Sequence, residues 1–315
     1  MSLNQSDIIA ETIPMIVATG NEEAEASAGD NAETSDDVVS GNGTEQLSFW
    51  RYLWSYQSVE LLLCFATVLI GLSLQLVEPY QRPIPYQSLN DGTILRNMMY
   101  DNVDKGETVG PTVLLVVAIP VPILVQIALC ILLTRNASLS ERREMIHRTL
   151  CVYFLGIGLT YIITNVGKRY TGYLRPIFYD LCEPSYDYTE CLSESNYYAG
   201  ASSEWEARVS FPSGHASFSV CSCLLFSLFL EHFFGKTAYM KTVAKPNGSE
   251  TQQQPLPPTT PWIRIISVLC YTPVLLGIFI ALSRVHDNHH HPADIVGGTL
   301  LGGTVASFVF DIWFS

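Results

Sequence analysis

The polar segment Ser283–Asp294 reads Ser-Arg-Val-His-Asp-Asn-His-His-His-Pro-Ala-Asp and joins two strongly apolar segments. It holds one arginine, four histidines and two aspartates in twelve residues. Ionisable residues at the ends of membrane helices often mark a functional site. The segment therefore indicates two membrane helices with a polar site between them. The plainer alternative is a short loop whose histidines only face water.

His290 and Asp294 give this segment its chemistry. They are four residues apart, so on a helix they share one face. Pro292 suits the first turn of that helix, where its missing N–H leaves no hydrogen bond unmade. A carboxylate one turn from an imidazole fixes the tautomer of the ring and stabilises its cation. Such a pair is the orienting half of a nucleophilic or acid–base site.

The whole chain has the composition of a membrane protein. Of its 315 residues, 48% are hydrophobic and only 15% are charged, whereas a soluble domain has about 25% charged residues. Residues 1–48 hold ten acidic residues and no Lys or Arg, so this tail carries most of the formal net charge of −13. The net charge therefore says little about the substrate.

The sequence divides into a tail, 1–48, and a membrane domain, 49–315. The tail contains no aromatic residue and is rich in small and acidic residues. Such a segment buries too little apolar surface to fold, so we predict that it is disordered. It also lacks the basic start and the continuous apolar core of a signal peptide.

The membrane domain contains six apolar segments, each close to the ~20 residues that a helix needs to cross a bilayer. They run over about 58–78, 112–134, 149–167, 212–231, 262–283 and 292–313. The fold class that this pattern predicts is an all-α integral membrane protein with six transmembrane helices. Pro120 and Pro122 predict a kink in the second helix. Gly298 and Gly302 have the spacing that lets a helix approach its neighbour closely.

Positively charged residues indicate the orientation in the membrane. The loops 135–148 and 232–264 carry clusters of Lys and Arg, and such loops favour the cytosolic side. We therefore expect a multi-pass protein of the endomembranes or the plasma membrane, with both termini in the cytosol. Cys182 and Cys191 would then lie in an oxidising compartment, where they could pair. Two free thiols are the alternative.

Three polar clusters fall at helix ends that alternation places on one membrane face, the luminal or extracellular one. Randomly placed polar ends would be spread over both faces, so this arrangement predicts a single site. The clusters are Lys168 and Arg175 at the end of the third helix, Ser213, Gly214 and His215 at the start of the fourth, and Arg284, His290 and Asp294 between the fifth and sixth.

The cations of these clusters suit a multiply charged anion. Lys168, Arg175 and Arg284 can surround phosphate oxygens, which arginine matches with two parallel hydrogen bonds. Ser213 and Gly214 offer a hydroxyl and backbone N–H groups at a helix start, where anions bind. Taken singly, Lys168, Arg169 and Arg175 could be snorkelling helix-end charges. Pro212-Ser213-Gly214 could be a simple turn and helix cap.

The histidines suit a nucleophile and an acid. His290, oriented by Asp294, can attack phosphorus, and His215 can protonate the leaving oxygen. Water would then hydrolyse the phosphohistidine. We expect no metal cofactor, because the cations stabilise the developing charge. A metal cluster of His289, His290 and His291 is a weaker alternative, because consecutive histidines cannot easily bind one ion.

The three clusters resemble the signature motifs of the type 2 phosphatidic acid phosphatase (PAP2) superfamily. The surroundings are most similar to its lipid phosphate phosphatase branch, except that Ile177 stands where many members have histidine. The motifs are Lys168-x6-Arg175-Pro176, Pro212-Ser213-Gly214-His215 and Ser283-Arg284-x5-His290-x3-Asp294.

This resemblance implies a six-helix, Mg-independent enzyme that hydrolyses phosphatidate and related lipid phosphates. It gives His290 the role of nucleophile, His215 that of acid and Asp294 that of relay carboxylate. It makes five further residues phosphate binders: Lys168, Arg175, Ser213, Gly214 and Arg284. The expected partners are the lipid phosphate substrate and membrane lipids, with no nucleic acid. A homo-oligomer remains possible.

Three alternatives stay open. A polyisoprenyl-diphosphate or sugar-phosphate phosphatase would use the same motifs, because they recognise the phosphate and not the group it leaves. A non-catalytic protein that binds lipid phosphates would typically lose motif residues, and this chain keeps every one. A transporter or channel would carry more ionisable residues deep inside its helices.

Overall fold

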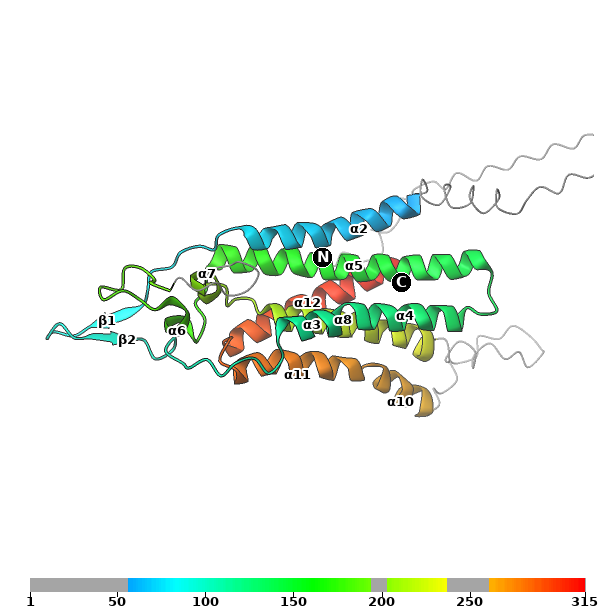
Figure 1. Ribbon diagram of the computed structural model, residues 1–315. Coiled ribbons are helices and arrows are strands. Elements are labelled where there is room, and N and C mark those ends of the chain that lie inside the picture. The colour runs from blue at the N-terminus through cyan, green and yellow to red at the C-terminus, as the bar shows by residue number, and fades with distance from the viewer. Residues whose placement is uncertain (1–55, 194–202, 237–260, 315) are drawn as a thin grey trace, which may run out of the picture. The chain divides into compact units, whose positions relative to one another are not determined.

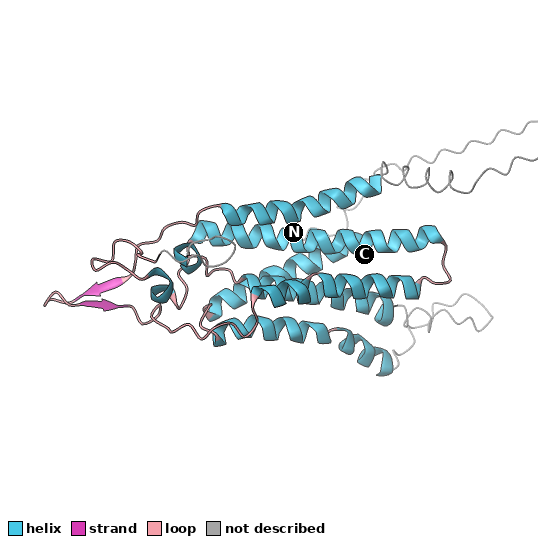
Figure 2. Cartoon of the chain, viewed as in Figure 1, coloured by secondary structure: helices cyan, strands magenta, loops and turns pink. Residues whose placement is uncertain are grey.

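The computed structural model describes residues 56–193, 203–236 and 261–314. Among them, six helices are long and apolar enough to cross a membrane, which confirms the predicted all-α fold with six spans (Figures 1 and 2). The acidic tail predicted for residues 1–48 lies outside the described residues, so its disorder stays a prediction.

The spans follow the predicted order along the chain, and several consist of more than one helical piece. They are α2 (Tyr56–Ser73) with the 3-10 turn η1 (Leu74–Leu76), α3 (Pro111–Ala118) with α4 (Pro120–Leu133), α5 (Leu139–Thr171), α8 (Gly214–Leu230) with the π-helical η2 (Glu231–Lys236), α10 (Pro261–Cys270) with α11 (Thr272–His286), and α12 (Pro292–Phe314).

The second span breaks at Ile119, as the prolines predict, because Pro120 cannot donate a backbone hydrogen bond and restricts the residue before it. One boundary differs from the prediction: the third helix begins at Leu139 rather than near residue 149. Its first turns are charged, so hydropathy misses them. Ser138 and Glu141 form a reciprocal capping box that fixes this start.

Helix α8 lies at the centre of the packing, against α5, α11 and α12, while α2 packs on α5. Tyr153 of α5 ties the spans together, because its buried hydroxyl bonds the Ala118 carbonyl and lies 2.5 Å from the Ser222 hydroxyl. Large apolar side chains such as Leu62 and Leu300 remain exposed on the outside of the bundle. Such side chains suit contact with lipid.

Glycines of α12 let it pack closely on α8, as the spacing predicts. A Cβ placed on Gly298 would lie 2.6 Å from the Ser213 carbonyl oxygen and 2.9 Å from the Ala216 Cβ. Gly302 similarly faces the Ser217 carbonyl. This contact sets the position of the first turn of α12 relative to the start of α8.

We expect Gly298→Val to destabilise the protein, because the added methyl groups would press on α8 backbone that cannot move away. Overpacking of this kind costs about 1–3 kcal/mol. The apparent melting temperature of the purified protein in detergent measures the effect. Gly303→Ala is the matched control, since a Cβ at Gly303 meets nothing within 4 Å. Equal melting temperatures for the two variants would contradict the close approach.

Loops at one end of the bundle form a small ordered cap. It contains the antiparallel strands β1 (Tyr86–Ser88) and β2 (Ile94–Arg96) and the short helices α6 (Phe178–Cys182) and α7 (Ser203–Ala207).

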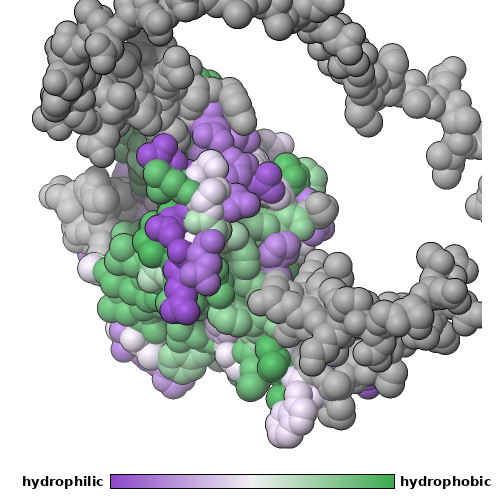
Figure 3. Space-filling view, turned by 90° about the vertical axis from the view of Figure 1, so that its right-hand side faces the viewer, coloured by the Kyte–Doolittle hydropathy of each residue, from purple (hydrophilic) through white to green (hydrophobic). Residues whose placement is uncertain are grey.

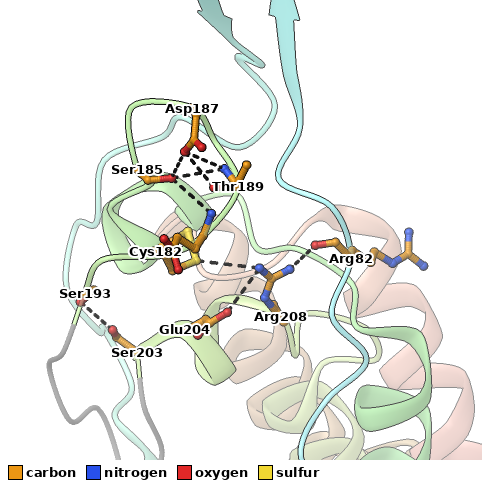
Figure 4. Close-up of a disulfide and its surroundings, with 11 residues drawn as sticks. Arg82, Cys182, Ser185, Asp187, Thr189, Ser193, Ser203, Glu204 and Arg208 are labelled. Atoms are coloured by element: carbon orange, nitrogen blue, oxygen red, sulfur yellow. Dashed lines mark hydrogen bonds and ion pairs between the residues drawn. A yellow bond between two sulfur atoms is a disulfide. The ribbon is translucent and has the colours of Figure 1, made fainter.

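The structure joins Cys182 and Cys191 in a disulfide, the pairing that the sequence left open. Arg208 lies beside it and donates a hydrogen bond to the Arg82 carbonyl (Figure 4). Its Nη2 also lies 3.5 Å from Glu204 Oε1. The cap thereby connects the loop after α2 to the segment that leads into α8.

Candidate active site

All three sequence motifs reach the same end of the bundle, where α5 and α11 end and α8 and α12 begin. His215 and His290 each interact electrostatically with Lys168, Arg175 and Arg284. The structure thus brings together residues that are up to 126 positions apart in the chain. The convergence expected from alternating helices is present in the side chains.

His290 and Asp294 form the pair that their spacing predicts. His290 Nδ1 lies 3.4 Å from Asp294 Oδ2, and both side chains are buried. The same carboxylate oxygen accepts hydrogen bonds from the Ser210 hydroxyl at 2.6 Å and from the His291 backbone N–H at 2.9 Å. Because Nδ1 faces the carboxylate, Nε2 is the ring nitrogen available for attack.

The backbone before α12 sets the position of His290. Helix α11 ends at His286, and Asn288 takes a left-handed conformation with φ 64°, which asparagine tolerates better than most residues. The N–H groups of His289 and His290 then both donate to the Arg284 carbonyl, at 3.0 and 3.2 Å. This tight turn holds His290, the candidate nucleophile, beside Arg284, a candidate phosphate ligand.

The surroundings of His290 keep its ring neutral. Burial, together with Arg175, Lys168 and Arg284, lowers the pKa of His290 well below its ordinary value. Burial and Arg175 also lower the pKa of His289. A neutral imidazole has the free electron pair that a nucleophile needs.

These lowered pKa values predict acid sensitivity. Below the ordinary histidine pKa of about 6.5, the unfolded chain binds protons that the folded protein does not, so stability falls as pH falls. We expect the apparent melting temperature in detergent to drop between about pH 7.5 and about pH 5. His290→Gln should show a smaller drop. The same drop in both proteins would show that His290 does not contribute.

The start of α8 supplies the second motif. Ser213 caps the helix, with its side chain accepting from the Ala216 N–H at 3.4 Å, and its own N–H donates to the Asp294 carbonyl at 3.1 Å. The Lys168 ammonium lies 3.7 Å from where a Cβ on Gly214 would be. A side chain at Gly214 would therefore take up space between the helix start and the lysine, where an anion has to fit.

His215 shares a hydrogen-bond acceptor with Arg284. His215 Nε2 lies 3.1 Å from the Val109 carbonyl oxygen, which can only accept, so Nε2 carries the hydrogen. Arg284 Nη1 donates to the same oxygen at 3.3 Å. The Val109 carbonyl thus accepts hydrogen bonds both from His215 of the second motif and from Arg284 of the third.

Two glutamates that the sequence did not single out neutralise the arginines. Arg284 pairs with Glu107 at 2.8 Å, and Arg175 pairs with Glu206. Although burial raises the pKa of Glu206, Arg175 and Lys168 lower it below its ordinary value, so the carboxylate is charged. The only sequence signal was that each acid stands a few residues before a span, which is too common to be selective.

The segment before α3 lies across the third motif. Asp287 accepts from the Thr108 N–H at 2.8 Å and from its hydroxyl at 2.5 Å, and Asn288 donates to the Val103 carbonyl at 2.9 Å. His289 contacts Asp104 at 3.1 Å. Asp287, Asn288 and His289 therefore hold this loop in place, and His289 also lies against the site, because Arg175 Nη1 is 3.3 Å from its Nδ1 and donates to its carbonyl at 3.3 Å.

The chain is similar to known proteins over the region that holds the three motifs. The family model described as the PAP2 superfamily matches residues 149–315, more than half of the chain, and this range includes all eight candidate residues. Two similar proteins are "Phospholipid phosphatase-related protein type 1" of Rattus norvegicus and of Mus musculus, each 27% identical over 281 residues. That alignment covers 80% of this chain and 78% of each relative.

The protein of the same name from Homo sapiens is 25% identical over 299 residues, which cover 85% of this chain and 82% of that relative. No solved structure matches the chain. The family model covers the three motifs and the helices that bring them together. The chain therefore belongs to the PAP2 superfamily.

Proposed function

We propose that this protein is a lipid phosphate phosphatase that hydrolyses phosphomonoesters of phosphatidate and related lipids. One observation carries the proposal: the His290–Asp294 pair meets His215 and three cations at one end of a bundle of membrane-spanning helices. A nucleophile, an acid and an anion site in one place are what transfer of a phosphoryl group requires.

In the first step, His290 Nε2 forms a bond to phosphorus while the bond from phosphorus to the lipid oxygen breaks. His215 acts in its imidazolium form, which the negative charge of the bound phosphate favours, and gives one proton to that oxygen, so the lipid leaves as an alcohol and His215 becomes neutral. In the second step, water loses a proton to His215 as its oxygen attacks the phosphohistidine. The P–N bond breaks, inorganic phosphate forms and His290 is restored. Asp294 stabilises the positive charge that His290 gains.

The cations hold the phosphate oxygens through both steps. Lys168, Arg175 and Arg284 stabilise the negative charge that spreads over the oxygens, and the N–H groups at Ser213 and Gly214 add donors at the helix start. The proposed reaction uses no metal ion.

Glu107 is the carboxylate that the substrate has to displace. It occupies Arg284 in the ligand-free protein, and a phosphate bound there would bring like charges together. Glu206 lies on α7 and pairs with Arg175. We propose that Glu107 leaves when substrate binds, and that Glu206 stays and holds Arg175 in position.

A lipid substrate is favoured by where the site lies. The candidate residues stand at the ends of membrane spans, so a headgroup can reach them while the acyl chains stay in the bilayer. The names of the similar proteins also refer to phospholipids. We further propose that both termini lie in the cytosol and the site on the opposite side, because the basic loops follow α4 and η2.

The test is phosphate release by the purified full-length protein in detergent micelles, with and without EDTA. We expect release from phosphatidate, lysophosphatidate and ceramide phosphate at rates that EDTA does not change. Preferred release from a polyisoprenyl diphosphate or a water-soluble sugar phosphate would favour the other enzymes with these motifs. Phosphatidate binding without release would favour the non-catalytic alternative.

A further inference from the structure

A second cluster of reactive side chains lies far from the candidate active site. Helix α2 contributes Glu60 and Cys64, and α5 contributes His147 and Cys151. Within each pair the residues are four apart, so each helix presents both side chains on one face. His147 stands 21 residues before Lys168 on α5, which is about 32 Å along the helix. The cluster is therefore separate from the phosphate site.

The ligand atoms of this cluster are close together. His147 Nε2 lies 2.9 Å from Glu60 Oε2 and 3.5 Å from Cys151 Sγ, and these three atoms all fall within 4.8 Å of one another. Cys64 of α2 also interacts with Cys151. Cys64, His147 and Cys151 are buried, whereas Glu60 is partly exposed.

The two distances from His147 Nε2 are close to the edges of a tetrahedral zinc site. With Zn–N near 2.05 Å and Zn–S near 2.3 Å, the edges of the tetrahedron are about 3.6 Å from nitrogen to sulfur and about 3.3 Å from nitrogen to oxygen. The observed distances differ from these by a few tenths of an ångström. Thiolate and imidazole ligands also favour zinc over magnesium or calcium, which prefer oxygen.

We propose that Glu60, Cys64, His147 and Cys151 bind one zinc ion that joins α2 to α5. The ion would neutralise the carboxylate and one thiolate at a buried contact between these helices. A cavity of about 310 Å³ borders Glu60 and His147 and is also lined by Gln57, Glu144 and Arg148. It gives an ion a polar route to the cluster. Figure 3 shows the end of the bundle where α5 begins, with hydrophilic residues gathered next to hydrophobic surface.

Cobalt binding tests the proposal directly. The purified full-length protein, reduced and stripped with a chelator, is titrated with Co²⁺. We expect a thiolate-to-cobalt charge-transfer band, the intense visible bands of a tetrahedral ion and displacement by one equivalent of Zn²⁺. His147→Ala and Cys151→Ser should each weaken binding on the order of 100-fold or more, since the loss of even outer-shell partners costs 10- to 100-fold.

Two control variants should bind cobalt like the wild type. Glu144→Gln removes a carboxylate that lines the same cavity but is outside the ligand set, and Cys270→Ser removes a buried thiol on α10. Size-exclusion profiles in detergent show which variants fold. If His147→Ala does not fold, Glu60→Gln replaces it, because the Glu60 side chain is partly exposed and its loss disturbs the packing least.

Three results would overturn the proposal. They are the absence of a thiolate–cobalt band in the wild type, unchanged binding in the folded ligand variants, or a Cys64–Cys151 disulfide in the protein isolated without reductant. Because the readout is the spectrum of the bound metal, it does not depend on phosphatase activity. Failure of the zinc site and failure of the proposed function are thus distinguishable.

Discussion

His290→Ala is expected to abolish phosphate release, lowering kcat/KM for phosphatidate by about 10⁴-fold or more, the scale on which loss of a nucleophile acts in other hydrolases. Alanine has no atom that can form the bond to phosphorus, and the remaining cations stabilise charge without an attacking group. Steady-state phosphate release in detergent micelles measures the loss. The variant should still bind phosphatidate, because Lys168, Arg175 and Arg284 are unchanged.

His286→Ala is the matched control for this experiment. His286 belongs to the same polar segment, but its side chain is exposed, and Lys105 donates a hydrogen bond to its backbone carbonyl. It should retain activity close to that of the wild type. Substantial phosphate release by His290→Ala would eliminate His290 as the nucleophile and with it the phosphohistidine intermediate.

Asp294→Asn is expected to lower kcat by about 10²- to 10⁴-fold, as the corresponding change does in other carboxylate–histidine pairs, and to change KM little. Asp294 Oδ2 accepts from Ser210 and from the His291 N–H. An amide keeps the size of the side chain but cannot stabilise a cationic His290. One orientation of the amide would also point an N–H group at another donor.

This split between kcat and KM separates positioning of the nucleophile from binding of the phosphate. Asp311→Asn removes a carboxylate near the other end of α12, where the residue is exposed, and should leave both constants unchanged. A kcat for Asp294→Asn within a few-fold of the wild type would mean that the carboxylate only caps the helix. A raised KM at unchanged kcat would place it in substrate binding instead.

The sequence predicted the spans because their signal is local. A bilayer requires about 20 apolar residues per helix, and proline and glycine mark breaks and close approaches through their own backbone chemistry. Local signals also misplaced one boundary: the charged start of α5 is invisible to hydropathy, although Ser138 and Glu141 carry a capping signal.

The motif residues were predictable for a related reason. Alternation of six helices fixes which ends share a face, so Lys168, His215 and His290 had to lie at the same end of any such bundle. The spacing of His290 and Asp294 fixed their pairing within one turn. The catalytic role of these residues stays a prediction until activity is measured.

Tertiary structure alone decided which charges face each other across the chain. Glu107 pairs with Arg284 from a loop, and Glu206 pairs with Arg175 from the short helix α7. Glu60 of α2 contacts His147 of α5, which is 87 residues away in the sequence. The hydrophobic periodicity of the sequence does not predict such contacts, since the folded chain can place an acid against many partners.

The sequence by itself thus determined the six spans, the shared helix ends and the His290–Asp294 pair. The partners of each buried charge depended on how the loops close over the bundle, because burial makes an unpaired charge costly and the folded chain selects the partner within reach.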